Sequence, residues 1–211
     1  MIAVRDLARS ERFYVRHFGF HVAERLESLR RLERPGATLG ATAEGAPRPM
    51  PRVELQVFRP ERDLSLIATW LSRAHVSRWW GEPSQALSEV STHDAETAAL
   101  ITLDAQPVGF LCWQTPSPAE LNDAGLADLP SDLVDVDIMI GEPIALGQGA
   151  GPEALRQLFD RLRDRGVRLV GLGTALANER AIAAYPKAAL QPYRDFVESG
   201  EPYRYFTRSL A

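Results

Sequence analysis

Hydrophobic and polar positions after residue 52 follow the two periods expected of strands and helices. Alternation with period two, together with short apolar runs, predicts strands over 53–60, 98–114, 134–140, 168–173 and 202–210, the second being two strands joined at "DAQP". Apolar residues at helical spacing predict helices over 61–80, from Pro152 onward and over 178–189. This order predicts an α/β fold of the α+β kind, with a mixed, mainly antiparallel central sheet flanked by helices.

The beginning of the chain has a separate pattern. Residues 1–45 predict a strand, a helix, a second strand and a hairpin that turns at "PG", which together make a βαββ segment. The stretch "AEGAPRPMPR" holds three prolines and a glycine, as a linker would. We therefore expect a small segment over 1–45, a linker over 46–52 and a larger domain over 53–211. So small a segment buries little surface alone and should pack on the larger domain or on a partner subunit.

Length and cysteine usage set the class of protein. A chain of 211 residues can bury a core without disulfides, and its single cysteine, Cys112, rules out an intramolecular one. Because "VGFLCW" is apolar, we expect Cys112 to be a buried, inert thiol. The N-terminus lacks a signal-peptide pattern, and no apolar run approaches the ~20 residues of a membrane span. These observations predict a cytoplasmic protein without a membrane partner.

Charge is distributed very unevenly along the chain. Residues 79–155 carry 13 acidic residues and no lysine or arginine, whereas the flanking segments carry an excess of arginine. Such a middle segment disfavours nucleic acid and attracts cations, above all if part of it lines a cleft. Alternatively, the acidic residues of 117–133 form only a solvated surface loop.

A glycine-rich loop follows the strand predicted over 134–140. Gly147, Gly149 and Gly151 precede a helix, and the unpaired N–H groups of a helix N-terminus favour an anion such as a phosphate. The loop lacks the Lys-Ser/Thr of a P-loop, and by itself it is equally consistent with a tight turn.

Three motifs in order give this loop a context. "WLSRAHVSRWWGEP", "VDIMIGEPIALGQGAG" and "NERAIAAYPKAAL" resemble motifs of the GNAT acyl-CoA N-acyltransferase superfamily, and most closely those of its aminoglycoside 6′-N-acetyltransferase branch. The resemblance covers about residue 53 to the end and implies the GNAT fold. The chain departs from the family pattern at Leu146, in "GLGTALAN" and at "AAL" after Lys187. Pro186 also follows Tyr185 directly, which predicts that Tyr185 is kept out of helical geometry.

The resemblance implies acetyl-CoA as cosubstrate and assigns residues to its binding. Asn178 would hydrogen-bond the pantetheine arm, although asparagine at this point is also a favoured helix N-cap. Tyr185 would be the general acid toward the departing thiolate, and without the motif it would be a core aromatic residue. The implied cofactor-binding residues are Ile138, Met139, Ile140, Gly147, Gln148, Gly149, Ala150, Gly151 and Asn178.

Carboxylates on the strand before the loop suit an amine acceptor. Acetyl transfer needs a neutral amine, so a nearby carboxylate can bind the ammonium and accept its proton. Asp137 is our candidate for this role, and a structural aspartate at a strand end is the alternative. Asp135 is expected on the same strand face, because side chains alternate with period two. It is either a second ligand for the cationic substrate or simply solvated.

The acceptor pocket is expected near the tandem tryptophans. Trp79 and Trp80 would stack on the acceptor, with Glu82 and Asp94 adding acidic character. His75 is expected to have a structural polar role. The four histidines show no metal-ligand spacing, so no metal site is predicted.

The first 45 residues resemble the opening of the glyoxalase/bleomycin-resistance superfamily. The resemblance rests on "VRDLARSERFYVRHFGFHV" followed by "LERPGATL", and it covers one partial βαββ module. The positions at which metal-using members place their ligands are not filled here, which argues against metal chemistry. We expect a remnant that packs on the transferase domain or pairs with its copy in a homodimer.

Together these features predict an acetyl-CoA-dependent N-acetyltransferase that modifies an amine of a cationic small molecule, most readily an aminoglycoside, and thereby confers antibiotic resistance. A lysine N-acyltransferase of the siderophore type is an alternative enzyme. A protein that only binds a cationic drug, without catalysis, is an alternative of a different class.

Overall fold

The computed structural model describes residues 51–198 and 200–211. The predicted βαββ segment of residues 1–45 and most of the predicted linker lie outside the described residues. The strands are β1 (Val53–Val57), β2 (Ala98–Leu103), β3 (Gln106–Gln114), β4 (Val134–Ile140), β5 (Leu169–Ala175), β6 (Gln191–Glu198) and β7 (Glu201–Ser209). The helices are α2 (Pro60–Leu71), α3 (Ala74–Trp80), α4 (Pro83–Val90), α5 (Pro118–Asp123), α6 (Ala150–Asp164) and α7 (Glu179–Ala184), with 3-10 turns η1 (Pro143–Ala145) and η2 (Tyr185–Ala188).

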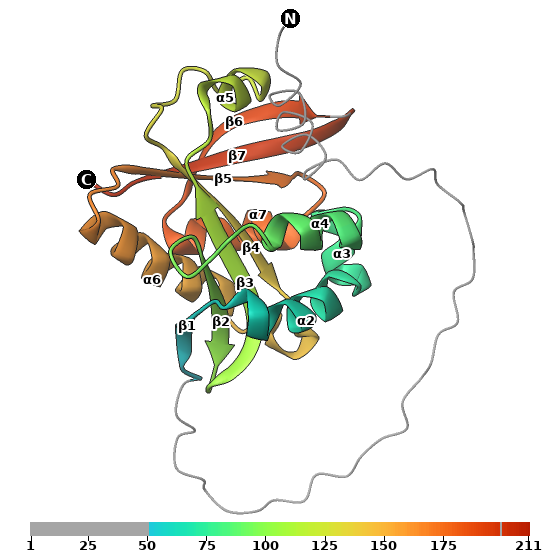
Figure 1. The fold of residues 1–211 in the computed structure, drawn as a ribbon. Coiled ribbons are helices and arrows are strands. Elements are labelled where there is room, and N and C mark those ends of the chain that lie inside the picture. Colours follow the sequence, from blue (N-terminus) through green and yellow to red (C-terminus); the bar gives the residue numbers. More distant parts are fainter. Residues whose placement is uncertain (1–50, 199) are drawn as a thin grey trace, which may run out of the picture.

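The strands form one seven-stranded sheet in the order β1-β2-β3-β4-β5-β7-β6 (Figure 1). Every neighbouring pair is antiparallel except β4 and β5, which are parallel. The predicted mixed, mainly antiparallel sheet is therefore confirmed. β4 and β5 pair only at Val134 with Val170 and at Asp135 with Gly171. Beyond these residues the two strands leave the ladder, so the sheet opens into a fork at its centre.

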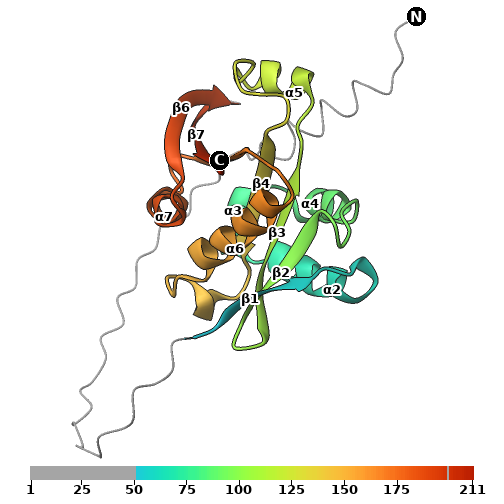
Figure 2. The same cartoon turned by 90° about the vertical axis from the view of Figure 1, so that its left-hand side faces the viewer.

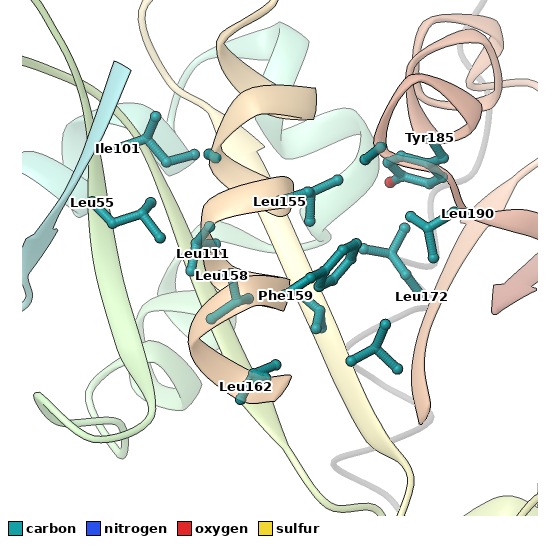
Figure 3. Close-up of a cluster of buried hydrophobic side chains, with 14 of the residues drawn as sticks. Leu55, Ile101, Leu111, Leu155, Leu158, Phe159, Leu162, Leu172, Tyr185 and Leu190 are labelled. Carbon is teal, nitrogen blue, oxygen red and sulfur yellow. The ribbon is translucent and has the colours of Figure 1, made fainter. Parts of the chain in front are cut away.

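Helices cover both faces of the sheet. Figure 2, which views the sheet closer to its edge, shows α6 on one side and α2 and α4 on the other. Helix α6 packs on the sheet through Leu155, Leu158, Phe159 and Leu162, which lie at the spacing of one helical face and are all at most 3% exposed. Figure 3 draws these side chains in the larger of the hydrophobic clusters.

A second hydrophobic cluster lies between α2–α4 and the other face of the sheet. Trp70 and Ile67 of α2 are fully buried there against strand residues such as Phe110 and Cys112. Cys112 is thus buried, as predicted. Of the helices in the described part of the chain, none is long and apolar enough to cross a membrane.

The helix predicted over 61–80 is in fact two helices. α2 ends at Leu71, and α3 begins at Ala74 after Arg73, which has an extended backbone with φ −78° and ψ 131°. The periodicity continued through the break because Trp70 and Val76 both face the same cluster. Helices α4 and α5 and strand β6 were not predicted from the sequence.

The acidic side chains of 117–133 are largely exposed to solvent, but the segment is not merely a solvated loop. Ser117 caps α5 in a capping box with Glu120, and leucines of the segment pack against Tyr205 in a third hydrophobic cluster. Asp128 forms an ion pair with Arg194 at 2.8 Å. A hydrogen bond from the Tyr193 hydroxyl, together with Arg194, lowers the pKa of Asp128 to about 2. Asp132 pairs with Arg168 at 3.0 Å. Much of the acidic charge is therefore neutralised by arginines from the C-terminal third of the chain.

Candidate active site

The fork between β4 and β5 contains a cavity of about 620 Å³, the size of a small-molecule site. Residues of β4 and β5 form its sides, and α3, α6 and α7 complete its walls. Both site residues expected to do chemistry, Asp137 and Tyr185, line this one cavity.

Alternation along β4 divides the cavity into two halves. Asp137 is paired in register with Cys112, which belongs to the cluster under α2–α4, so Asp137 faces that side of the sheet. Ile138 and Ile140 face the opposite side and pack on the cluster under α6. The strand therefore presents a half-buried carboxylate toward α3 and an apolar surface toward α6. We call the part of the cavity toward α3 the α3 half and the part toward α6 the α6 half.

Asp135 shares the strand face of Asp137, as predicted, but it does not line the cavity. It is 8% exposed and accepts a 2.7 Å hydrogen bond from the Tyr205 hydroxyl. The alternative of a solvated Asp135 is therefore wrong, and the geometry also removes it from the acceptor pocket. Burial first, and then the charge of Asp135, raises the pKa of Tyr205 well above its ordinary value.

Tyr185 belongs to the α6 half. It is 8% exposed, and its ring packs edge-on against Phe206 with 5.4 Å between the centroids. Figure 3 shows Tyr185 among the core side chains. Burial is the main cause that raises its pKa, and the Thr174 side chain is a hydrogen-bond partner of its hydroxyl. Tyr185 is thus both a core aromatic residue and a lining residue of the cavity.

The expected effect of Pro186 on Tyr185 is not observed. Tyr185 has φ −62° and ψ −40°, which is helical geometry. The effect of Pro186 coincides instead with the end of α7 at Ala184, after which the chain continues in the 3-10 turn η2. Two guanidinium groups hold this turn: Arg156 donates to the Lys187 carbonyl at 2.8 Å, and Arg208 donates to the Ala188 carbonyl at 2.9 Å.

The glycine loop leads into α6 two residues earlier than predicted, with Gly149 as N-cap. Gly147 and Gly149 have φ of 77° and 83°, a region that strongly favours glycine. Pro152 has no N–H, so Ala150 and Gly151 supply the free donors of the first turn. Of the loop residues predicted to bind the cofactor, Gly151 lines the cavity, whereas the other four, Gly147, Gln148, Gly149 and Ala150, lie outside it.

Asn178 caps a helix and also lines the cavity, so it fits both of the roles considered for it from the sequence. Its side chain accepts a hydrogen bond from the Ala181 N–H at 3.3 Å and so caps α7, and it also lines the cavity. The predicted cofactor residues Ile138, Met139 and Ile140 line the cavity as well.

Side chains of "WLSRAH" join α2 and α3 to the end of β4. The Trp70 indole donates to Glu142 at 2.8 Å, and Arg73 donates to the Gly141 carbonyl and to Glu142, each at 2.7 Å. His75 lies 3.2 Å from the Ile140 carbonyl, the kind of structural polar contact expected for it. A Cβ at Gly141 would collide with the Trp70 ring, so this position requires glycine.

The α3 half contains the two tryptophans but fewer acids than predicted. Trp79 and Trp80 line the cavity, and Trp80 also packs edge-on against Phe110 at 6.4 Å. Glu82 does not line it, because its carboxylate caps α4 at the Gln85 N–H. Asp94 is likewise outside, where it accepts hydrogen bonds from Thr97 and the Glu96 N–H.

Charges on the cavity wall are balanced rather than acidic. Among the described lining residues, the charged side chains are Asp137, Glu179, Arg78 and Arg180. Neither arginine was predicted from the sequence to be a site residue. Arg78 directly precedes Trp79 and Trp80, which were predicted to line the pocket. This position in the sequence could have identified Arg78 as a site residue.

Family comparisons describe most of the chain. The family "Acetyltransferase (GNAT) domain" matches residues 59–197. The "Glyoxalase/Bleomycin resistance protein/Dioxygenase superfamily" matches residues 1–107, which confirms the resemblance of the N-terminal segment. The match extends beyond the predicted residue 45 into β1, α2–α4 and β2, and it ends at the start of β3.

Individual relatives are aminoglycoside acetyltransferases. Aminoglycoside N(6′)-acetyltransferase type 1 of Klebsiella pneumoniae and that of Serratia marcescens are each 26% identical over 153 residues, which is 62% of this chain and 70% of each relative.

Solved structures of such enzymes share the fold. AAC(6′)-Ib in complex with paromomycin and acetyl-CoA gives a TM-score of 0.61 at 21% identity and covers 74% of this chain and 93% of that one. The aminoglycoside N(6′)-acetyltransferase of Legionella pneumophila gives 0.56 at 15% identity and covers 75% and 92%.

Proposed function

This chain belongs to the GNAT acetyltransferase family, and from that premise we propose that it transfers the acetyl group of acetyl-CoA to an amine of a small cationic molecule. The observation that carries the proposal is the forked cavity, which brings a half-buried carboxylate on one side and a buried phenol on the other into a single space. Aminoglycosides are the acceptor class that the relatives support.

The cofactor is proposed to lie in the fork, on the α6 half. Beyond Asp135 the edge of β4 that faces β5 has no ladder partner, so its backbone groups can pair with the amides of pantetheine. The N–H groups of Ala150 and Gly151 at the N-terminus of α6 suit the pyrophosphate, because the helix dipole favours an anion there. Asn178 faces the same space and is assigned to the pantetheine arm.

Asp137 is proposed to receive the amine. An alkylamine is protonated at neutral pH, and a carboxylate both attracts the ammonium and accepts its proton. The neutral nitrogen then attacks the thioester carbonyl carbon, a C–N bond forms, and the C–S bond breaks. The ammonium first gives one proton to solvent through Asp137. After the attack the nitrogen gives a second proton to Asp137, and the sulfur departs as a thiolate that takes one proton.

Tyr185 is proposed to stabilise that thiolate by donating a hydrogen bond. Its pKa is raised above the ordinary value of 10.0, whereas a thiol has a pKa of about 8.5. Full proton transfer from Tyr185 to the sulfur would therefore run uphill and leave a buried tyrosinate near two carboxylates. The final proton of the thiol comes from solvent or from Asp137.

The proposed function is tested by release of free thiol from acetyl-CoA with a panel of aminoglycosides, lysine derivatives and no acceptor. Thiol release that depends on the amine supports it, and Asp137→Asn should lower kcat/KM by about 10²-fold, the usual size of a general-base contribution. Asp160→Asn on the exposed face of α6 is the matched control and should leave the rate unchanged. Binding of the drug without thiol release would instead support a protein that only sequesters it.

A further inference from the structure

Among the lining residues on α3 and β4, one side chain is an acid and one is an arginine. Asp137 contributes the carboxylate and Arg78 the guanidinium. The other carboxylates predicted for this half are engaged elsewhere: Asp135 with Tyr205, and Glu82 with the first turn of α4. The half that should receive the acceptor is thus balanced in charge, which does not match a molecule with only positive groups.

Arg78 stacks on its neighbour and forms no ion pair among the described residues. It lies in the last turn of α3, is exposed, and stacks on Trp79 with 4.6 Å between its guanidinium carbon and the ring centroid. It makes no ion pair with any residue in the described part of the chain. Stacking uses the faces of a guanidinium and leaves its N–H edge free to bind a carboxylate or phosphate with two parallel hydrogen bonds.

The backbone of α3 is fixed relative to Asp137. Arg73, one residue before the helix, is bonded to Gly141 and Glu142, which follow the β4 strand that carries Asp137. Val76 on the inner face of α3 is 2% exposed. The backbone of α3 is therefore anchored to β4, and Arg78, Asp137 and the two tryptophans line the same cavity.

We propose that Arg78 is a specificity residue that binds an anionic group of the acceptor. The preferred acceptor is then an amine that also carries a carboxylate or phosphate: Asp137 receives the ammonium, Arg78 the anion, and Trp79 and Trp80 the connecting stem. Polycations such as aminoglycosides are acetylated less efficiently, because one of their charges meets Arg78. This inference rests on the proposed acetyl transfer, and it favours an acceptor with an anionic group over the aminoglycosides that the relatives support.

The test compares lysine with cadaverine, which differ by one carboxylate, and adds kanamycin as a polycation. Each is assayed by thiol release at one ionic strength with the wild type and with Arg78→Met, Arg78→Lys and Arg78→Glu. We expect the wild type to favour lysine by about tenfold in kcat/KM, as for a charge-assisted hydrogen bond that is partly screened. Arg78→Met should abolish the preference, Arg78→Lys retain most of it, and Arg78→Glu reverse it and raise kcat/KM for kanamycin by about tenfold.

Arg163→Met, on the surface of α6, is the matched control and should keep the wild-type ratio. Equal ratios in the wild type and Arg78→Met would overturn the proposal, as would a rise in KM for acetyl-CoA alone, which would assign Arg78 to the cofactor. Calorimetric binding of lysine and cadaverine in the presence of coenzyme A measures the same ratio without turnover. A failure of acetyl transfer therefore remains distinct from a failure of this inference.

Discussion

Asp135 and Gly171 are the last cross-strand pair between β4 and β5, and the Tyr205 hydroxyl fills the space beside both of them. It donates to Asp135 at 2.7 Å and occupies the position that a Cβ at Gly171 would take. The fork that forms the cavity therefore begins at a point where one tyrosine, from β7, fixes the two strands that separate.

Replacing Gly171 by alanine tests this point. The added methyl would collide with the Tyr205 hydroxyl, push it from Asp135 and destabilise the protein by about 1–3 kcal/mol. Gly173→Ala is the matched control, because its Cβ would meet the Tyr205 ring at an ordinary 3.6 Å. Urea denaturation measures both, and an equal free energy of unfolding for the two variants would contradict the assignment.

Removal of the Tyr185 hydroxyl tests its proposed role as a hydrogen-bond donor. Tyr185→Phe should lower kcat by about tenfold, as expected for one hydrogen bond to a charged atom, with little change in KM. The pH–rate profile of the wild type should show no inflection from Tyr185 below pH 10, because burial raises its pKa. A loss of 10³-fold or more would instead support full proton transfer from Tyr185.

Stability at high pH should depend on the same buried phenols. The pKa values of Tyr185 and Tyr205 are raised above 10.0, so above that pH the unfolded chain loses protons that the folded chain retains. The free energy of unfolding should therefore be constant with respect to these groups below about pH 10 and fall as pH rises further. In Tyr185→Phe the fall should be shallower, which chemical denaturation at pH 9, 10 and 11 measures. A slope identical to that of the wild type would refute the linkage.

The turn that carries Tyr185 offers a further test. Arg208→Met removes the hydrogen bond to the Ala188 carbonyl at the end of η2, and kcat should fall several-fold while KM for acetyl-CoA stays the same. Arg208→Lys can still donate to that carbonyl and should restore most of the rate. If Arg208→Met lowered only the melting temperature, the arginine would have a purely structural role.

The sequence predicted the strands with an apolar run or a clear alternation, including the edge strand β1, and missed β6, which has neither. β4 and β5 were predictable because apolar side chains dominate them, whereas β6 is an edge strand with mostly exposed residues and shows no such pattern. The break between α2 and α3 was hidden for another reason. It depends on the hydrogen bonds of Arg73 to residues 68 and 69 positions away, which no local pattern contains.

The candidate site, too, could be predicted only in part from the sequence. Motif order brought Asp137 and Tyr185 together in advance, and period two placed Asp135 and Asp137 on one face. The difference between the two aspartates comes from Tyr205, 70 residues further along the chain, which buries and hydrogen-bonds only Asp135. Likewise, an acidic pocket was predicted from the many carboxylates in residues 79–155. In the fold, Asp128 and Asp132 of that segment form ion pairs with arginines.

That pairing also bears on how the chain is made. The segment 79–155 leaves the ribosome with 13 acidic residues and no lysine or arginine, and the partners of Asp132 and Asp128, Arg168 and Arg194, are synthesised later. Until they emerge, the segment repels itself and its α5 region lacks the cations that hold it in place. Translation must therefore pass Arg194 before residues 117–133 can make these native ion pairs, so this part of the fold is completed late.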